Sequence, residues 1–344
     1  MKRVIAVWCL LIAFSFVGIV GANAADDKVI KWKMQCSNPK GDAAYDIHAV
    51  EFAKMVERVS NGKIKVDLFA PGQLVAVPEM VTALSNGMID AATVYGPLYN
   101  GIVPIADVES GLPYSFSSVD QVVELFWDPK YRLVDIIREG WAKKNIHYAS
   151  PGSCGTYAFM TTYAVNSLQD IKGHKFRGMG SIGKWIRLAG GAPTAIPASE
   201  IYMSLKMGTV DGTPFTPMGL ETMKLKEVVK YMVLPGVIVS GNVCSLVNKK
   251  SWDALPEDLR KKLLDEKEAI SSYRRDGAAY AARDEIGLTA ATKVGLKTVT
   301  WSDSDMMQAR RIASEIWDEV GSKGASERKA IDLLKRYYTE KKLM

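Results

Sequence analysis

The sequence has few cysteines, and those that it has are scattered. Cys9 lies within an N-terminal apolar run, which leaves Cys36, Cys154 and Cys244, none of them in a CxxC spacing. An odd, scattered set does not favour a disulfide scaffold or a zinc site. One disulfide stays open for an exported chain, but the spacing does not select a pair.

Histidine is scarce as well, and the sequence lacks the common catalytic motifs. His48, His147 and His174 are isolated, and neither an HExxH or HxH spacing nor a GxSxG elbow occurs. We therefore predict no catalytic residues, no metal site and no cofactor, and expect a protein that is not an enzyme. A secreted enzyme stays an alternative that turnover of a bound acid would revive.

Neither sign of charge dominates the chain. Lysine and arginine number 44 against 38 acidic residues, and the basic residues are spread along the chain rather than grouped. A nucleic-acid-binding protein usually carries a concentrated basic patch. We therefore expect no nucleic-acid partner.

The first 24 residues have the pattern of a secretory signal peptide. Lys2 and Arg3 precede an apolar run from Val4 to Val20, and Ala22-Asn23-Ala24 provides an A-x-A cleavage site. A retained anchor is the alternative, but the run is close to the lower limit for spanning a bilayer. We expect cleavage of residues 1–24 and a periplasmic mature protein.

Strand and helix patterns alternate in the mature chain, whose length of about 320 residues suits two lobes. Residues 28–35 and 63–72 alternate as strands and flank a helical pattern at 44–62, which predicts a parallel pair with a crossover helix. EMVTALSNGMID (79–90) and EIYMSLKMGTVD (200–211) echo each other, each a helix closed by glycine before a strand. We interpret this echo as two lobes built alike.

Two extended, glycine-containing segments, 145–155 and 233–250, predict crossings between the lobes. We assign residues 25–149 plus about 238–255 to lobe I, and 150–237 plus about 256–344 to lobe II. A cleft between two hinged lobes is the natural ligand site. After Pro256 the chain is almost wholly helical, which predicts a long helix that braces a lobe or, less often, pairs with a second subunit.

IKGHKFRGMG (171–180) places Arg177 at the end of a strand, beside glycines. Gly178, Gly180 and Gly183 also spell the GxGxxG of a dinucleotide fold, but the strand before them is too charged for a buried first strand. The glycines and the following helix start still favour an anion close to the backbone. A guanidinium there can hold a carboxylate by two parallel hydrogen bonds, whereas a surface salt bridge is the ordinary alternative.

SLQDIKGHKFRGMG (167–180) resembles the segment of TRAP (tripartite ATP-independent periplasmic) transporter solute-binding proteins, the DctP family, that carries a carboxylate-binding arginine. Four further segments resemble the family in the same order: SNGKIKVDLFAPGQL (60–74), EMVTALSNGMID (79–90), EIYMSLKMGTVDG (200–212) and LVNKKSWDALPEDLRKKL (246–263). The resemblance implies an α/β, two-lobed periplasmic binding protein fold, hinged and type II-like, with long C-terminal helices. It puts Arg177 on the family's arginine.

The chain departs from the family where ligand choice is decided. Tyr157 stands where many members carry a second arginine, which argues for a monocarboxylate rather than a dicarboxylate. Pro214 and Phe215 replace a Glu-Trp pair of the 2-oxo acid branch, otherwise the nearest branch, so no acid is left there to hold a cation. By family analogy we also expect Tyr95, Tyr99 and Asn38 at the ligand. These residue types give an apolar cleft.

The resemblance thus implies the solute-binding subunit of a TRAP transporter that delivers an organic acid to membrane permease subunits. We expect Arg177 to clamp the carboxylate, Tyr157 to hydrogen-bond beside it and Phe215 to stack on the tail. The preferred ligand is a 2-oxo acid or amino acid with an apolar or aromatic tail. Alternatives are a C4-dicarboxylate or sugar acid, or a receptor for a signalling partner. The protein is expected as a monomer or a helix-swapped dimer.

Overall fold

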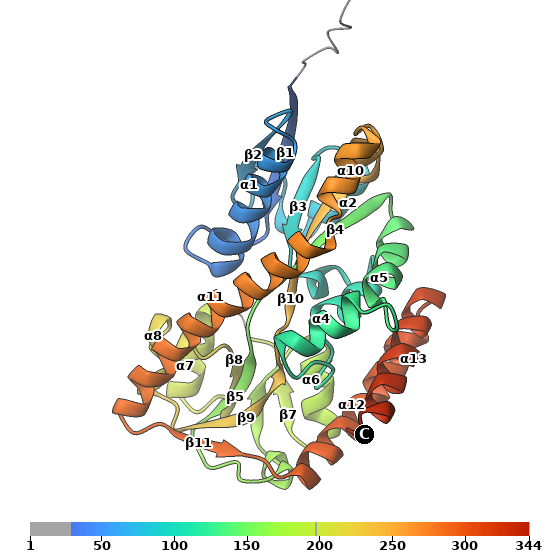
Figure 1. The fold of residues 1–344 in the computed structure, drawn as a ribbon. Coiled ribbons are helices and arrows are strands. Elements are labelled where there is room, and N and C mark those ends of the chain that lie inside the picture. The colour runs from blue at the N-terminus through green and yellow to red at the C-terminus, as the bar shows by residue number, and fades with distance from the viewer. Residues whose placement is uncertain (1–28, 197, 344) are drawn as a thin grey trace, which may run out of the picture.

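The computed structural model describes residues 29–196 and 198–343, and it has two lobes, each built on its own sheet (Figure 1). The predicted signal peptide, residues 1–24, lies outside the described residues. The sheets have strand orders β2-β1-β3-β10-β4 and β11-β9-β5-β8-β6-β7, and helices cover both. The predicted two-lobed α/β fold with long C-terminal helices is confirmed.

The first sheet begins with the predicted strand, helix and strand. Its strands are β1 (Ile30–Cys36), β2 (Ile64–Phe69), β3 (Ala91–Val94), β4 (Ile146–Ser153) and β10 (Asn242–Asn248). β1 and β2 run parallel, joined by the π-helix η1 (Ala44–Ala49) and α1 (Val50–Val59), so the crossover prediction is confirmed. The remaining helices of this part are η2 (Val77–Glu79), α2 (Met80–Ser85), η3 (Gly96–Tyr99), α3 (Ile105–Ser110), α4 (Val119–Trp127) and α5 (Leu133–Ala142).

The second sheet is built from the middle of the chain with one late strand. Its strands are β5 (Tyr157–Thr161), β6 (Lys175–Arg177), β7 (Ala192–Thr194), β8 (Gly212–Phe215), β9 (Tyr231–Ile238) and β11 (Lys297–Thr300). Its helices are η4 (Leu168–Ile171), α6 (Gly180–Leu188), η5 (Ala198–Glu200), α7 (Ile201–Lys206), α8 (Gly219–Thr222) and η6 (Leu225–Glu227). β6 runs parallel to both β7 and β8.

The two echoing segments have the same structure in the two lobes. Each consists of a short 3₁₀ helix, a short α-helix and a strand: η2-α2-β3 in one lobe and η5-α7-β8 in the other. Gly87 and Gly208 follow the two helices with φ of 73° and 68°, the left-handed conformation in which glycine ends a helix without strain. The C-terminal glycine signal in the sequence is thus confirmed at both positions.

The aspartates that close these segments also make matching bonds. Asp90 accepts a hydrogen bond from the N–H of Lys33 in β1, and Asp211 accepts one from the N–H of Lys175 in β6, each 2.9 Å long. β1 and β6 are therefore equivalent strands, each lying beside the strand that follows the aspartate. Counting on from the lysines makes Gln35 of the first lobe the counterpart of Arg177 in the second.

The two segments predicted to cross between the lobes are hydrogen-bonded to each other. The N–H of Cys154, between β4 and β5, donates to the carbonyl of Gly241, between β9 and β10, at 2.6 Å. The N–H of Gly241 donates in turn to the carbonyl of Gly155 at 3.0 Å. The Tyr273 hydroxyl lies over this crossing, 3.0 Å from the hydroxyl of Ser240. The paired crossings form the structural connection about which two lobes can hinge.

The C-terminal part contributes helices to both lobes. It contains α9 (Lys249–Asp253), α10 (Glu257–Leu263), α11 (Glu266–Lys293), α12 (Asp303–Gly321) and α13 (Ala325–Glu340). α11 packs on β4 of the first lobe and α8 of the second, crossing the molecule diagonally (Figure 1). α12 packs on α6, and α13 packs on α5. The long helix is therefore a brace between the lobes of this chain.

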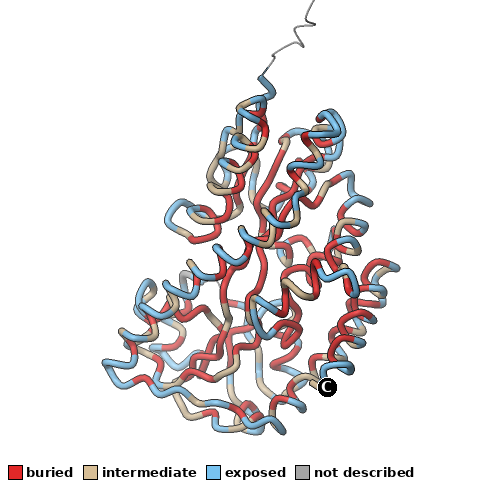
Figure 2. Tube along the Cα trace, in the orientation of Figure 1, coloured by how far each residue is buried: buried red, intermediate tan, exposed pale blue. Residues whose placement is uncertain are grey.

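Burial follows the sheets and the inner faces of the helices, whereas the outer helix faces are exposed (Figure 2). The described cysteines, Cys36, Cys154 and Cys244, are all buried and unpaired, so none of them forms a disulfide. Among residues 29–196 and 198–343, no helix combines the length and the apolar character needed to cross a bilayer.

Candidate functional site

A cavity of about 200 Å³ lies between the two lobes, at the ends of their central strands. The residues of its wall that matter here are Asn38, Asp42, Tyr95, Tyr157, Phe215 and Tyr280. Asn38 and Tyr95 follow β1 and β3, and Phe215 ends β8. Ligands of open α/β sheets bind outside the carboxyl ends of the strands, so this cavity is the candidate site.

Arg177 ends β6, the strand that pairs with β8, and the last residue of β8, Phe215, lines this cavity. Arg177 itself is not among the lining residues, and a backbone carbonyl holds its side chain. Its Nε donates to the carbonyl of Ile196 at 3.1 Å, and the residue is 9% exposed. Its counterpart Gln35 binds the equivalent loop of the first lobe with both ends of its amide, through Leu74 and Val75. Arg177, whose side chain is longer, makes the same kind of anchoring bond through Nε, and its two Nη groups remain available to donate hydrogen bonds.

The charge of Arg177 has no protein carboxylate to balance it. Neither Nη atom makes a hydrogen bond or ion pair with any residue of 29–196 or 198–343. Burial lowers the pKa of the guanidinium, and the nearby Tyr157 and Tyr95 hydroxyls oppose that shift. Arginine stays protonated in proteins even so. A buried cation with free paired donors is suited to a ligand carboxylate.

Aromatic side chains form the wall of the cavity next to Arg177. The rings of Tyr157 and Phe215 meet edge to face, with centroids 6.2 Å apart. Burial raises the pKa of the Tyr157 and Tyr95 hydroxyls, so both are neutral donors near the guanidinium. The site can thus hold a carboxylate at one end and apolar or aromatic atoms at the other.

The remaining residues named from the sequence separate into one at the cavity and one in the core. Asn38 lines the cavity, and its Oδ1 accepts a hydrogen bond from Ser37 Oγ at 2.9 Å. Tyr99 is 2% exposed, donates its hydroxyl to the Val77 carbonyl at 2.6 Å and is not among the residues that line the cavity. The structure therefore brings Asn38, Tyr95, Tyr157 and Phe215 together, with Arg177 beside them.

Sequence reasoning did not select Asp42 and Tyr280, which line the cavity, or Asp284, which does not line it but binds the Met218 N–H of its wall. Asp42 lies just before η1, and Tyr280 projects from α11. One signal was available, because Tyr273, Tyr280 and Asp284 follow one another at helical spacings of seven and four and mark a single face of α11. Nothing in the local sequence of Asp42 shows that it faces a cavity.

Asp284 fastens α11 to the loop after β8. Its Oδ1 accepts a hydrogen bond from the Met218 N–H at 3.0 Å. Burial raises the pKa of this carboxyl to about 6, and the backbone hydrogen bonds partly offset that effect. The raised pKa reflects the desolvation of a carboxyl group buried between α11 and the loop after β8.

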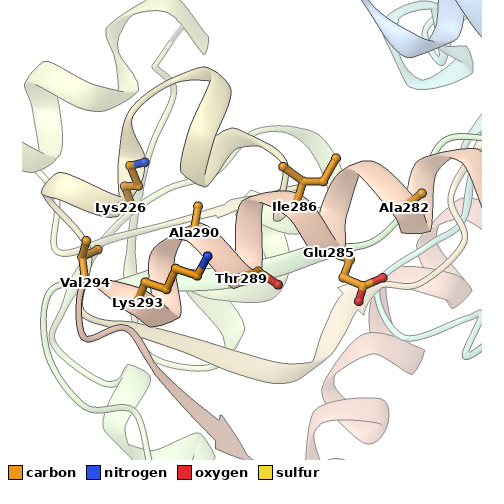
Figure 3. A pocket seen from close by; sticks show the side chains of 8 residues that line it. All are labelled: Lys226, Ala282, Glu285, Ile286, Thr289, Ala290, Lys293 and Val294. Carbon is orange, nitrogen blue, oxygen red and sulfur yellow. The ribbon is translucent and has the colours of Figure 1, made fainter.

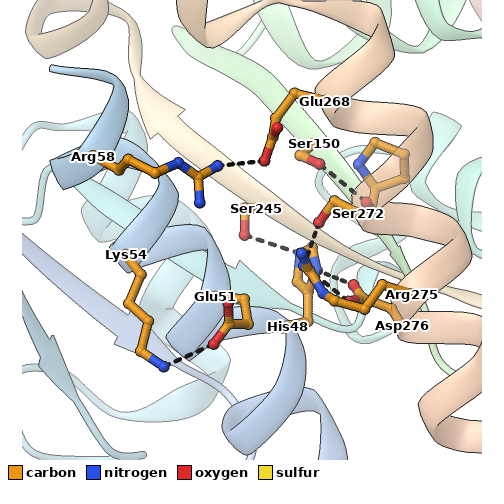
Figure 4. Close-up of polar contacts among 11 residues, drawn as sticks. His48, Glu51, Lys54, Arg58, Ser150, Ser245, Glu268, Ser272, Arg275 and Asp276 are labelled. Carbon is orange, nitrogen blue, oxygen red and sulfur yellow. Dashed lines mark hydrogen bonds and ion pairs between the residues drawn. The ribbon is translucent and has the colours of Figure 1, made fainter.

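A second polar cluster has the Ser-His-Asp composition of a catalytic triad, but it is buried away from solvent. His48 Nδ1 lies 2.8 Å from Asp276 Oδ2, and its Nε2 lies 3.1 Å from Ser245 Oγ (Figure 4). These three side chains are at most 2% exposed. The hollow beside His48 measures about 20 Å³, which is room for about one water molecule. No substrate can reach the serine, so we interpret the cluster as a tie between α11 and the first lobe.

A larger but shallow hollow of about 560 Å³ lies on the outer face of α11, away from the cleft (Figure 3). It is formed along one helix face that includes Ile286 and Val294, with Lys226 opposite. None of the residues expected at the ligand lies there. Within the described residues, no group of three or more histidine, cysteine or acidic side chains is arranged to hold a metal ion.

Comparison with known proteins identifies the family of the chain. The family described as bacterial extracellular solute-binding protein, family 7 (DctP), matches residues 37–323. A monocarboxylate 2-oxoacid-binding periplasmic protein from Nostoc sp. is 25% identical over 311 residues, covering 90% of this chain and 84% of that protein.

Solved structures have the same fold. A TRAP periplasmic solute-binding protein from Rhodobacter sphaeroides, in an apo open state, gives a TM-score of 0.78 at 24% identity and covers 91% of this chain and 99% of its own. An extracytoplasmic solute receptor from Bordetella pertussis that binds pyroglutamic acid gives 0.71 at 18% identity, with coverage of 89% and 99%. The ligands named for these relatives differ, so the similarity shows the fold of this chain but does not identify its ligand.

Proposed function

The chain belongs to the bacterial extracellular solute-binding proteins, family 7, the periplasmic receptors of TRAP transporters, and on that premise we propose that its cleft captures an organic monocarboxylate. Proteins of this family bind small organic acids and work with membrane permease subunits. The proposed ligand has an apolar or aromatic tail, as a 2-oxo acid or an amino acid does. We further propose that residues 1–24 are removed on export to the periplasm.

One observation carries this proposal: a buried arginine whose paired Nη donors have no acceptor among the residues that the structure describes. Arg177 is 9% exposed and is anchored by a single bond to Ile196. An uncompensated buried cation is costly unless a ligand anion pairs with it. A bound carboxylate would satisfy both Nη groups at once.

The rest of the wall favours one carboxylate and an apolar tail. Tyr157 is neutral at physiological pH and offers a donor but no second positive charge. Phe215 stands against Tyr157, and Leu98 and Met218 add further apolar surface. A cavity of about 150 Å³ can hold benzene, so about 200 Å³ admits one ring or a branched chain.

A thermal-shift screen of residues 25–344 tests the proposal. A ligand that binds only the folded protein raises the melting temperature by mass action. The panel contains aromatic and branched 2-oxo acids and amino acids, C4-dicarboxylates and sugar acids. We expect stabilisation by the first group. Stabilisation by dicarboxylates or sugar acids alone would refute the apolar tail, and no response to any acid would refute the receptor function.

A further inference from the structure

Asp42 is the one acidic residue among the described residues that line the cavity. It lies just before η1: its Oδ1 accepts a hydrogen bond from the Ala44 N–H at 2.8 Å, and its carbonyl accepts one from the Asp46 N–H at 2.9 Å. These bonds fix the carboxylate at the first turn of the helix and engage one of its two oxygens. No lysine, arginine or histidine of residues 29–196 and 198–343 forms an ion pair with it.

Asp42 lines the cavity, and Arg177 ends the strand beside β8, whose last residue, Phe215, also lines it. The two side chains are not paired with each other. Both act on the same tyrosine: burial raises the pKa of Tyr157, Arg177 opposes that shift and Asp42 adds to it. Asp42 belongs to the first lobe and Arg177 to the second. Within the described part of the chain, neither charge has a protein partner of opposite sign.

We propose, building on the function proposed above, that Asp42 binds a ligand ammonium group, so that the cleft selects α-amino acids over the corresponding 2-oxo acids. A zwitterion supplies a carboxylate to Arg177 and an ammonium group to Asp42, which neutralises both. The two ligand classes share carboxylate and tail and differ only at the second carbon. At that carbon an ammonium group can donate hydrogen bonds to the Asp42 carboxylate. A 2-oxo oxygen can only accept hydrogen bonds, and the carboxylate has none to donate.

The aromatic wall supports the same choice. Tyr280 and Tyr157 both line the cavity with Asp42, and the electrostatic influence of Asp42 reaches both hydroxyls. Aromatic faces attract a cation within about 6 Å. The other nearby carboxyl, Asp284, does not line the cavity and already accepts from the Met218 N–H. Asp42 is therefore the residue that determines specificity. The amino acid proposed for this chain differs from the 2-oxo acid named for the Nostoc relative.

The test is a calorimetric titration with two matched ligand pairs: L-phenylalanine with phenylpyruvate, and L-leucine with 4-methyl-2-oxopentanoate. Wild-type protein, Asp42→Asn and Asp46→Asn are compared. Asparagine keeps an oxygen for the Ala44 N–H, so the helix start is preserved. Asp46 is an exposed carboxylate on the same helix and is the matched control.

We expect wild-type protein to bind one of the amino acids at least about tenfold more tightly than its 2-oxo partner. Asp42→Asn should lose that preference by weakening the amino acid at least about tenfold without weakening the 2-oxo acid, and Asp46→Asn should behave as wild type. A melting curve confirms that each variant folds.

Tighter wild-type binding of the 2-oxo acids, with or without added sodium or calcium, would overturn the role of Asp42 and leave the receptor function standing. Equal weakening of both members of a pair by Asp42→Asn would overturn it as well. Binding of neither pair would overturn both the inference and the ligand class proposed for the cleft.

Discussion

At the scale of single residues, the buried carboxyl of Asp284 couples the stability of the fold to solution pH. Its carboxyl sits where α11 meets the second lobe and accepts from the Met218 N–H. Its pKa is about 6 in the folded protein against an ordinary value of 3.8, with burial as the main cause. The folded state therefore binds more protons than the unfolded state between about pH 4 and 6, and stability falls as pH rises through that window.

Asp284→Asn is expected to remove this pH dependence, because asparagine keeps the acceptor and carries no charge. The variant should be more stable than wild type by about 1–3 kcal/mol at pH 7.5 and equal to it near pH 4. Thermal unfolding at both pH values measures the difference. Asp318→Asn is the control of opposite sign, because the Lys335 hydrogen bond lowers the pKa of Asp318. Destabilisation by Asp284→Asn at pH 7.5 would contradict the account.

The position of a site residue could be predicted only where the neighbouring sequence determines the local backbone structure. Arg177 follows a short alternating stretch and precedes glycines, so its place at a strand end could be read from the chain. Tyr99 could not be placed in the core, because its partner is the backbone carbonyl of Val77, 22 residues earlier. Asp42 could not be placed at the cleft, because the opposite wall comes from Tyr157 and Phe215.

At the scale of elements, the two lobes repeat one unit. β1, α1, β2, α2 and β3 of the first lobe correspond to β6, α6, β7, α7 and β8 of the second. In each sheet the first of these strands lies between the other two, so the sheet orders match as well. The similarity between residues 79–90 and 200–211 revealed this repeat, because the residues that end a helix and begin a strand are recognisable in the local sequence. The break between α10 and α11 at Leu264 was not visible, since neither proline nor glycine marks it.

The glycines of this unit should respond alike to substitution. Gly208 has no neighbouring atom within 4 Å of an added Cβ, and the nearest atom to Gly87 is 3.6 Å away. A substitution at either glycine therefore destabilises through backbone conformation rather than through a steric clash, since φ is 68° at Gly208 and 73° at Gly87. We expect Gly87→Ala and Gly208→Ala each to lower stability by about 1–2 kcal/mol, and the asparagine variants by less. Denaturant unfolding measures this, and a large cost at only one position would contradict the equivalence.

At the scale of the whole molecule, the way the two lobes are joined is consistent with the proposed closure over one ligand. The crossings meet at Cys154, Gly155 and Gly241, where backbone hydrogen bonds join the two crossing segments to each other. α11 spans both lobes (Figure 1). A Cβ on Gly287 would lie 2.2 Å from the Pro217 carbonyl oxygen, so the helix packs tightly on the second lobe. Residues from both lobes can then enclose a ligand between Asp42 and Arg177.

The most direct test of the central claim is a calorimetric titration of Arg177→Ala with the acid that most stabilises the wild-type protein. Loss of the buried cation should weaken binding by about 2–5 kcal/mol, at least about 30-fold. Arg187→Ala is the matched control, since Arg187 is exposed on α6, and it should bind as wild type does. Affinity retained by a folded Arg177→Ala within about threefold of wild type would contradict the claim that this arginine clamps the ligand carboxylate.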